Sequence, residues 1–455
     1  MVWSSLLNLI LPLINHSIFM TNSPGSKQAD DKPKKAFLVS VYKGTLQKVV
    51  CEEHLMELAL LADTFGLTTV GKMPCAVRKY DAATFVTEGK LNEIIEAATE
   101  AKAELVVFDD EITPAQQRNL ETKFKIPVMD RTEVILGVFA QRAQTKEARL
   151  QIELAQVKYQ APRLKRLWTH LSRQAGTSGG GAGGGGYLKG EGEKQIEIDR
   201  RILKRNIDLL QKEIDEVRAI RETQRNARLK SDVPVFAIIG YTNAGKSTLL
   251  NAPTKANVFV EDKLFATLDT TTRRFSLDNH QEVLLIDTVG FIRKLPHLLV
   301  AAFKSTLEEA LFADILIHLV DISHPMAEEQ AETTFEVLKE LNAEKKPIIT
   351  VLNKTDALEN PRLIDRMRVK YPKTLAISAL NKEGFEELKE RMVQEISHMR
   401  QIVTLIVPQS EYGVVSEVLR QGQVLDKDYE ENDVLLRVNI PTALAGKLKK
   451  YIKKE

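Results

Sequence analysis

The chain has 455 residues, of which 43% are hydrophobic and 28% are charged, and its formal net charge is +2. This length predicts about three domains. The near-balance of charge excludes a uniformly basic nucleic-acid-binding chain, so any basic partner surface must be local. With two cysteines, Cys51 and Cys75, the sequence excludes a disulfide framework and favours a reducing cytoplasm. The eight histidines show no spacing typical of metal ligands.

The start of the chain, Met1–Met20, is apolar but is interrupted by two Asn, one Pro and one His. No basic residue precedes the apolar run, as one would in a secretory signal, and the segment is too polar to span a bilayer comfortably. We interpret it as an upstream extension with Met20 as the working start; weak membrane contact and a secretory signal are the alternatives. Residues 1–35 together are expected to form a disordered or apolar leader.

Residues 36–137 alternate between predicted strands and helices, which indicates a small parallel sheet. Apolar runs predict strands at Phe37–Val41, within Glu104–Asp109 and at Ile126–Met129. Helical stripes predict helices at His54–Phe65, Leu91–Ala101 and from Glu133 to Ala140. A further helix is expected to open at Thr113–Pro114, an N-cap followed by a first-turn proline.

Three acids, Asp109, Asp110 and Glu111, follow the second of these strands. Carboxylates at a strand end can form a metal or nucleotide site. We favour the alternative, in which they are acids near a helix start on a solvated turn.

Residues 138–230 are predicted to form a hairpin of two long helices with a glycine-rich tip at Gly176–Gly186. Apolar residues recur at heptad spacing on both helices: Leu150, Leu154, Val157, Ala161, Leu164, Trp168 and Leu171, then Leu203, Ile207, Leu210, Ile214 and Val217. Such seams predict antiparallel packing, with a kink at Pro162.

The charge of this arm is one-sided. Between Gln141 and Ala175, eight Lys or Arg stand against two Glu. Basic residues flank the glycines on both sides: Arg163, Lys165, Arg166, Arg173, Arg200, Arg201, Lys204 and Arg205. A basic arm with a tip free of side chains suits the phosphate backbone of RNA in a confined cleft. The alternative is a solvated coiled coil with an ordinary linker.

Residues 231–400 contain Gly240–Ser247, which reads Gly-Tyr-Thr-Asn-Ala-Gly-Lys-Ser between the predicted strand Val235–Ile239 and a predicted helix. This is the pattern of a phosphate-binding loop. Lys246 is expected to reach the β- and γ-phosphates and Ser247 to bind Mg²⁺. Backbone N–H groups would surround the phosphates from Gly240, Tyr241, Thr242, Asn243, Ala244 and Gly245. The following helix should end or kink near Ala252, because Pro253 comes next.

Three more strand ends carry polar residues. The strand Val283–Ile286 ends in Asp287, Thr288, Val289 and Gly290, where the Asp can hold Mg²⁺ through water and the Gly N–H can meet the γ-phosphate. The strand Pro347–Leu352 ends in Asn353, Lys354, Thr355 and Asp356. The strand Leu375–Ile377 ends in Ser378, Ala379 and Leu380, placed to back a base.

The carboxylate of Asp356 can accept hydrogen bonds from both N1–H and N2–H₂ of guanine. Adenine lacks this donor pair, so a buried Asp356 would be left desolvated and unpaired against ATP. Because ligands bind at the carboxyl ends of strands in open α/β sheets, these strand ends predict a guanine nucleotide site.

The segment Phe265, Ala266, Thr267, Leu268 and Asp269 is expected to be a switch. Thr267 can coordinate Mg²⁺ when a γ-phosphate is bound and release it after hydrolysis. Thr270, Thr271 and Thr272 compete for that role.

Phe291 follows Gly290, where many GTPases carry a glutamine that orients water. A phenyl ring cannot do so by hydrogen bonding. We therefore predict slow intrinsic hydrolysis that a partner or an added cation completes.

Residues 401–455 are predicted to form a small α/β module, with strands at Ile402–Val407 and Val434–Ile440 and helices at Ser416–Gln421 and Ala443–Ile452. The module ends in Lys447, Lys449, Lys450, Lys453 and Lys454. An RNA or ribosome contact and a solubilising tail are both compatible with these lysines.

From about residue 36 to its end, the chain resembles the HflX family of ribosome-associated GTPases. The resemblance is carried by Asp110–Leu120, Asp130–Thr132, Phe139–Ala143, Glu153–Gln156 and Asp287–His297. It implies an N-terminal α/β domain with a long helical hairpin, a Ras-like P-loop GTPase domain and a small C-terminal α/β domain.

The resemblance also implies nucleotide-dependent binding to the large (50S) ribosomal subunit and its rRNA, with GTP hydrolysed to GDP and phosphate, in ribosome splitting, rescue or biogenesis. By the family pattern, Mg²⁺ falls to Ser247 and Thr267, and guanine to Asn353, Lys354 and Asp356. The catalytic set expected is Lys246, Thr267 and Gly290. Similar GTPases with an Asn at the position of Asn243 use K⁺ as a catalytic element.

We expect a cytoplasmic protein with no DNA partner, monomeric away from the ribosome, with peripheral membrane contact as the alternative. The chain departs from the family pattern at Pro253, at Thr270, where a proline is usual, and at Thr87–Lys90, where a more basic turn is usual. The alternative function is an RNA-remodelling or ATP-using N-terminal domain regulated by the GTPase domain, although no ATP motif is visible there.

Overall fold

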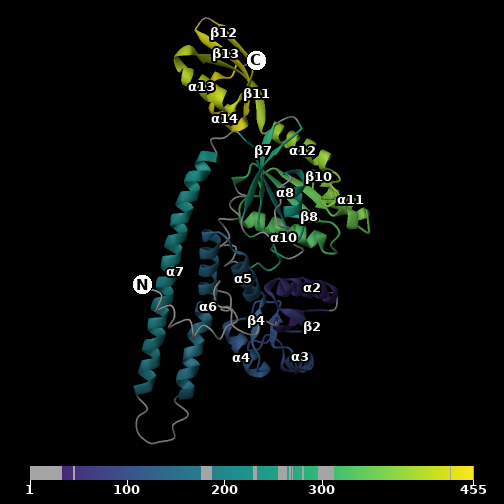
Figure 1. Cartoon of the computed structure of the whole chain (residues 1–455), viewed down its shortest axis with the longest axis vertical. Helices are drawn as coiled ribbons and strands as arrows, with labels where there is room; N and C mark the ends of the chain where they lie inside the picture. The colour runs from purple at the N-terminus through teal and green to yellow at the C-terminus, as the bar shows by residue number, and fades with distance from the viewer. Residues whose placement is uncertain are drawn as a thin grey trace, which may run out of the picture. The chain divides into compact units, whose positions relative to one another are not determined.

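The computed structural model describes residues 33–44, 47–175, 187–228, 233–254, 264–265, 268, 270–278, 281–295, 312–430 and 432–453. The chain divides into two compact units, Met1–Gln141 with Gln156–Leu203, and Arg142–Ala155 with Lys204–Glu455. Figure 1 shows the elements of both units.

The first unit contains a four-stranded sheet in the order β2-β1-β3-β4, with every pair parallel. Its strands are β1 (Lys35–Tyr42), β2 (Thr68–Ala76), β3 (Leu105–Phe108) and β4 (Val128–Asp130). Its helices are α2 (Lys48–Phe65), α3 (Glu88–Glu100), α4 (Pro114–Phe124) and α5 (Arg131–Arg142). The predicted parallel sheet is therefore confirmed.

Strand β2 was missing from the predicted elements. It is an edge strand with most of its side chains only partly buried, and it contains Gly71 and Pro74. Glycine and proline weaken a strand pattern but are tolerated at an edge. The predicted cap of α4 is confirmed, because the Thr113 hydroxyl accepts from the Gln116 N–H in a full capping box.

Two long helices, α6 (Lys146–Ala175) and α7 (Tyr187–Arg228), form the predicted arm and run side by side (Figure 1). Their antiparallel course follows from the Glu147–Arg221 ion pair at 3.2 Å, which joins the start of α6 to the end of α7. Seam residues Leu150, Leu154, Leu210 and Ile214 are buried, as the heptad pattern predicts.

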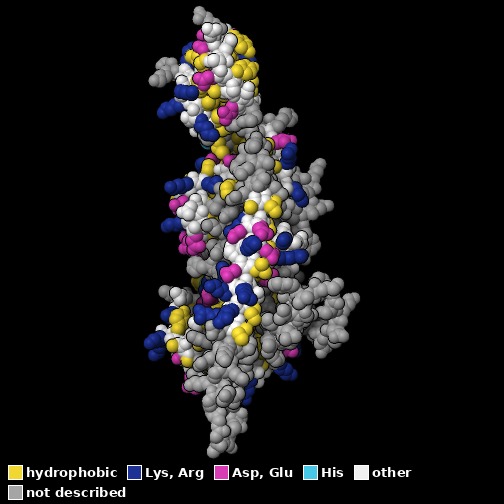
Figure 2. Space-filling model, turned by 90° about the vertical axis from the view of Figure 1, so that its left-hand side faces the viewer, with side chains coloured by type: hydrophobic (Ala, Val, Ile, Leu, Met, Phe, Trp, Pro, Cys, Tyr) yellow, Lys and Arg dark blue, Asp and Glu magenta, His cyan; other side chains and the backbone are white. Residues whose placement is uncertain are grey.

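Helix α6 continues through Pro162, so the proline does not end it. The predicted glycine-rich tip lies outside the described residues. Exposed basic side chains gather on α7, at Arg200, Arg201, Lys204 and Arg205. Figure 2, which shows the left-hand side of Figure 1, shows Lys and Arg side chains mixed with Asp and Glu on this face.

The second unit contains a six-stranded sheet in the order β10-β9-β8-β5-β7-β6, in which the β6 pairing alone is antiparallel. Its strands are β5 (Val235–Gly240), β6 (Thr271–Ser276), β7 (Glu282–Asp287), β8 (Ile315–Asp321), β9 (Ile348–Asn353) and β10 (Thr374–Ala376). Its helices include α8 (Lys246–Thr254), α10 (Ala327–Glu340), α11 (Arg362–Lys370) and α12 (Phe385–His398).

The central strands of this sheet are almost wholly apolar and buried, as strands covered on both faces must be. Strands β6 and β8 were missing from the predicted elements. Strand β6 is a partly exposed edge strand with two adjacent arginines. The described part of helix α8 continues through Pro253 to Thr254, so the proline does not end the helix at Ala252.

The C-terminal module contains an antiparallel sheet in the order β11-β13-β12. Its elements are β11 (Arg400–Pro408), α13 (Tyr412–Gln421), β12 (Gln423–Glu430), β13 (Asp433–Pro441) and α14 (Thr442–Lys447). The predicted helix Ala443–Ile452 was wrong in its second half, which holds a short 3₁₀ turn, Lys449–Tyr451, and then an antiparallel bridge from Ile452 to Leu405. Strand β12 escaped detection because it is charged and exposed along most of its length.

Among the described residues, no helix is both long enough and apolar enough to cross a bilayer.

Candidate nucleotide site

The loop between β5 and α8 adopts backbone conformations that demand glycine at two positions. Gly240 has φ +151° and Gly245 has φ +92°. A Cβ atom on Gly240 would lie 2.2 Å from the Leu319 carbonyl oxygen, and one on Gly245 would lie 2.4 Å from Asn353 Nδ2. Asn243 is also left-handed, at φ +62°. These conformations curl the chain so that its backbone N–H groups lie at the N-terminus of α8, where the helix dipole favours an anion.

Lys246 begins α8 and is buried at 7% exposure. Its ammonium donates to the carbonyl oxygens of Tyr241 at 2.7 Å and Gly240 at 3.2 Å. Burial lowers the pKa of Lys246 to about 8, and the neighbouring Asp287 opposes that shift. Because the ammonium group is desolvated, its interaction with an anionic ligand would be strongly favourable in electrostatic free energy.

The next residue, Ser247, donates its hydroxyl to Asp287 Oδ2 at 2.7 Å. Asp287 ends β7 and is fully buried. A hydroxyl and a carboxylate side by side are the hard oxygen donors that Mg²⁺ prefers. No group of three or more His, Cys, Asp or Glu in the described part of the chain could hold a metal. This donor set fits an ion that takes its other ligands from phosphate and water.

The segment after β7 is bonded directly to the phosphate-binding loop. The Thr242 N–H donates to the Phe291 carbonyl at 2.7 Å, and the Phe291 N–H donates to the Gly240 carbonyl at 3.0 Å. The Thr288 hydroxyl donates to the Ile238 carbonyl at 2.8 Å. Val289 and the Phe291 ring are buried.

Gly290 sits against the buried lysine. A Cβ atom there would lie 2.9 Å from Lys246 Nζ and 2.8 Å from Thr242 Cγ2. Only a glycine at this position lets the backbone come so close to the ammonium group.

Asn353, at the end of β9, connects two loops. Its Nδ2 donates to the Ala244 carbonyl at 2.8 Å, and its Oδ1 accepts from the Ala379 N–H at 2.9 Å. One carboxamide therefore ties the phosphate-binding loop to the segment after β10. Thr355 joins the same segment, because its N–H donates to the Ile377 carbonyl at 3.3 Å.

Asp356 lies beside that segment and accepts from the Ser378 hydroxyl. The expectation that Asp356 is buried was wrong, since its side chain is exposed. Its desolvation therefore has to come from a base lying over it. Leu380, expected to back the base, is 75% exposed.

The predicted switch falls only partly on described residues. Ala266, Thr267 and Asp269 lie outside them, so the predicted Thr267 ligand has no described position. Phe265 and Leu268 are buried, and Phe265 is left-handed at φ +55°. The competing residues Thr271 and Thr272 lie in β6, where they pair with Asp287 and Ile286.

Asp321, at the end of β8, was absent from the predicted site residues. It binds Lys354 through an ion pair of 2.7 Å between Nζ and Oδ2. The apolar run Ile315–Val320 that ends in this Asp was the signal that could have found it.

The acidic segment of the first unit is not a solvated turn. Asp109 is fully buried and pairs with Arg131 Nη1 at 2.8 Å, while Ser40 donates to its other oxygen at 3.4 Å. Arg131 also contacts Glu57. Our preferred interpretation was therefore wrong for Asp109, while Glu111 is exposed as expected. The charge of Asp109 is compensated by arginine.

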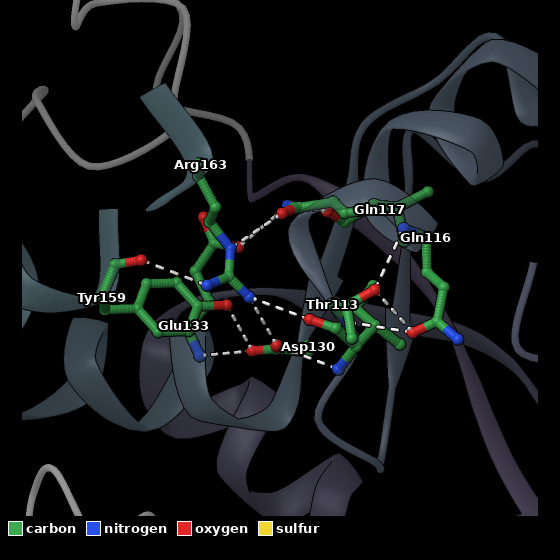
Figure 3. Close-up of polar contacts among 9 residues, drawn as sticks. Thr113, Gln116, Gln117, Asp130, Glu133, Tyr159 and Arg163 are labelled. Carbon is green, nitrogen blue, oxygen red and sulfur yellow. Dashed lines mark hydrogen bonds and ion pairs between the residues drawn. The ribbon is translucent and has the colours of Figure 1, made fainter. Parts of the chain in front are cut away.

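A second buried carboxylate, Asp130, ties the same sheet to helix α6 (Figure 3). It accepts from the Tyr159 hydroxyl at 2.7 Å and from Arg163 Nη2 at 3.1 Å. The N–H groups of Glu133 at 2.9 Å and Ile112 at 3.3 Å also donate to it. Asp130 is thus surrounded by donors and serves as an anchor for the arm.

Glu133 lies beside this anchor and is 8% exposed. Burial, and then the nearby Asp130 charge, raise the pKa of Glu133 from 4.5 to about 8. The folded state therefore holds a proton that the unfolded state releases above about pH 4.5, so stability falls as the pH rises from 4.5 to 8.

We expect Glu133→Gln to remove this pH dependence, because glutamine keeps the shape and never ionises. Urea midpoints from circular dichroism at pH 6 and pH 9 should differ less in the variant than in the wild type. The exposed Glu111→Gln variant should behave as the wild type does. Parallel pH curves for Glu133→Gln and wild type would contradict this account.

Three families match successive parts of the chain. They are described as GTP-binding GTPase N-terminal at residues 52–140, GTP-binding GTPase Middle Region at residues 142–228, and 50S ribosome-binding GTPase at residues 235–354.

Curated relatives match nearly the whole length. The GTPase HflX of Chlamydia pneumoniae is 45% identical over 436 residues, covering 95% of this chain and 92% of that protein. The GTPase HflX of Escherichia coli is 41% identical over 415 residues, covering 90% of this chain and 94% of that protein. Among solved structures, a GTP-binding protein from Sulfolobus solfataricus in complex with GDP is 24% identical, covers 80% of this chain and 99% of that chain, and has a TM-score of 0.43.

Proposed function

Because the chain belongs to the HflX family of P-loop GTPases, we propose that it binds the large ribosomal subunit in its GTP-bound state and that hydrolysis to GDP and phosphate times its release. Ribosome splitting, rescue or biogenesis is the process in which we propose that it acts. The observation that carries the nucleotide half of this proposal is the convergence of Lys246, Ser247, Asp287, Asn353 and Asp356 at one edge of the six-stranded sheet.

Support for the ribosomal half comes from the family described as 50S ribosome-binding GTPase, which matches residues 235–354. The exposed basic residues of α7, Arg200, Arg201, Lys204 and Arg205, add a surface suited to an RNA backbone. In the first unit, the arginines Arg131 and Arg163 pair with the buried carboxylates Asp109 and Asp130, so these two cations are already engaged and give an ATP phosphate no support. We propose a cytoplasmic location and a monomer away from the ribosome.

In the proposed mechanism, N–H groups of the loop Gly240–Gly245 other than that of Thr242, which donates to Phe291, bind the β-phosphate together with the start of α8. Lys246 spans the β- and γ-phosphates. Ser247, Thr267 and Asp287 would hold Mg²⁺, the last through water, and this ion would neutralise phosphate charge. On the base side, Asp356 accepts from guanine while Asn353 keeps the two loops together.

A γ-phosphate on Lys246 would compete with Gly290 for the space beside the ammonium group. The segment Asp287–Phe291 would then move with its hydrogen bonds to Gly240 and Thr242. The difference between bound GTP and bound GDP would in this way be transmitted to the surface of the domain as a conformational change.

Replacement of Lys246 by alanine should abolish nucleotide-dependent binding to the ribosome, because the phosphates lose their one buried cation on this loop. Sucrose-gradient sedimentation with large ribosomal subunits measures this, comparing a non-hydrolysable GTP analogue with GDP. Wild type should co-sediment with the analogue only, and the exposed Lys345→Ala variant should match it. Co-sedimentation of Lys246→Ala with the analogue but not with GDP, at the wild-type level, would refute the proposal.

Intrinsic hydrolysis should be slow, with a turnover on the order of 10⁻³ s⁻¹ or lower, because the buried Phe291 cannot orient water. The rate of phosphate release should rise by roughly tenfold or more when large subunits are added. Fast turnover by the isolated protein would contradict this.

The left-handed, exposed Asn243 leads us to propose that K⁺ assists hydrolysis at this site. Phosphate release measured in equimolar KCl and NaCl should be faster in KCl, and Asn243→Ala should remove the difference. Equal rates of the wild type in the two salts would end the idea.

A further inference from the structure

The residues after β9 are each held by a different partner. Asn353 is held by the carbonyl of Ala244 and the N–H of Ala379, and Asp356 by the hydroxyl of Ser378. Lys354, which lies between them, is held by Asp321 at 2.7 Å. The Asp321 contact is the one that comes from β8, the strand between the phosphate-loop strand and β9.

The Asp321 side chain is also held in place by contacts other than its ion pair with Lys354. Its side chain is 11% exposed, and Oδ1 accepts from both the Ser323 hydroxyl at 2.6 Å and the Ser323 N–H at 3.1 Å. The backbone is joined to the same place, since the Ile322 N–H donates to the Asn353 carbonyl at 3.0 Å. This leaves Oδ2 directed at Lys354 by a rigid turn.

Two features of Lys354, its backbone conformation and its partly exposed side chain, make a partner that orders it favourable for binding. Its backbone is left-handed, at φ +64°, which costs a non-glycine residue energy. Its side chain is 31% exposed, and a free lysine side chain loses rotamer entropy when a ligand immobilises it. An ion pair formed in advance removes part of that cost from the binding step.

On the basis of the proposed guanine site, we infer that Asp321 is a positioning residue for the base. It holds Lys354 extended beside Asn353 and Asp356, so that the side chains proposed to contact the base are ordered before the base binds. The side chain of Asp321 contacts Lys354 and Ser323, on the base side of the proposed site. Its effect therefore falls equally on GDP and GTP and leaves the chemical step alone.

The test is a double-mutant cycle on GDP and GTP-analogue affinity, measured with a fluorescent nucleotide on the full chain. Asp321→Asn keeps the shape and the acceptor for Ser323 but removes the charge. We expect it to weaken both nucleotides about tenfold, with a raised KM and an unchanged kcat. Lys354→Met should weaken both by a similar factor, and adding Asp321→Asn to Lys354→Met should cause no further loss.

Two further variants separate positioning from general damage. Ser323→Ala, which loosens Asp321 without touching the ion pair, should weaken nucleotide binding about threefold. Asp365→Asn, which removes an exposed ion pair of 3.9 Å with Arg368, should leave it unchanged. If Asp321→Asn folds poorly, Ser323→Ala carries the test, because it keeps both members of the ion pair and all the residues proposed to contact the base.

Additive losses in the double variant, or wild-type affinity in Asp321→Asn, would overturn this inference. So would a loss for the GTP analogue alone, because that would assign the effect to the phosphates. Failure of the wild type to bind GDP at all would instead overturn the proposed function, so the two failures are distinguishable.

Discussion

One side chain holds the nucleotide-binding half of this protein together. The Asn353 carboxamide donates to the phosphate-binding loop at Ala244 and accepts from the base-side loop at Ala379. Its Nδ2 comes so near Gly245 that no Cβ could fit there. The glycine of one motif and the asparagine of another are therefore a single packing constraint, although more than a hundred residues separate them in the chain. Strand order brings them together, because β9 lies two strands from β5 in the sheet.

Buried charge is treated in opposite ways in the two units. In the first, Asp109 and Asp130 are neutralised by Arg131 and Arg163, so these carboxylates hold the sheet and helix α6 in place. In the second, the ammonium of Lys246 is held by carbonyl oxygens, with Asp287 near enough to matter electrostatically. A carboxylate that already pairs with an arginine gains little electrostatic free energy from a ligand, whereas a desolvated cation among neutral dipoles gains much from an anion. The contrast is the physical basis for placing the nucleotide in the second unit.

Prediction from sequence succeeded where the signal was local. The loop Gly240–Ser247, the capped start of α4 at Thr113 and the buried strands β5, β7 and β9 all carry their pattern within a few residues. Three of the edge strands, β2, β6 and β12, were missed for the opposite reason, whereas the buried central strand β8 was missed although its apolar pattern is local. Strands β2, β6 and β12 are polar or partly exposed, since only one side of an edge strand is paired, and their residues resemble loops.

The chemistry available at each strand end can be recognised from consecutive residues alone, because a turn of glycine, lysine and serine or a terminal Asn-Lys-Thr-Asp needs no distant information. Which charges are buried, and which groups neutralise them, depends on how the strands are arranged in the folded chain. Asp109 meets Arg131, and Lys354 meets Asp321, through the order of strands in a sheet. Solvent exposure depends on the fold in the same way: the Asp356 side chain is exposed and the Asp109 side chain is buried. Electrostatic partners are chosen by proximity in space, and residues from neighbouring strands can be far apart in the chain.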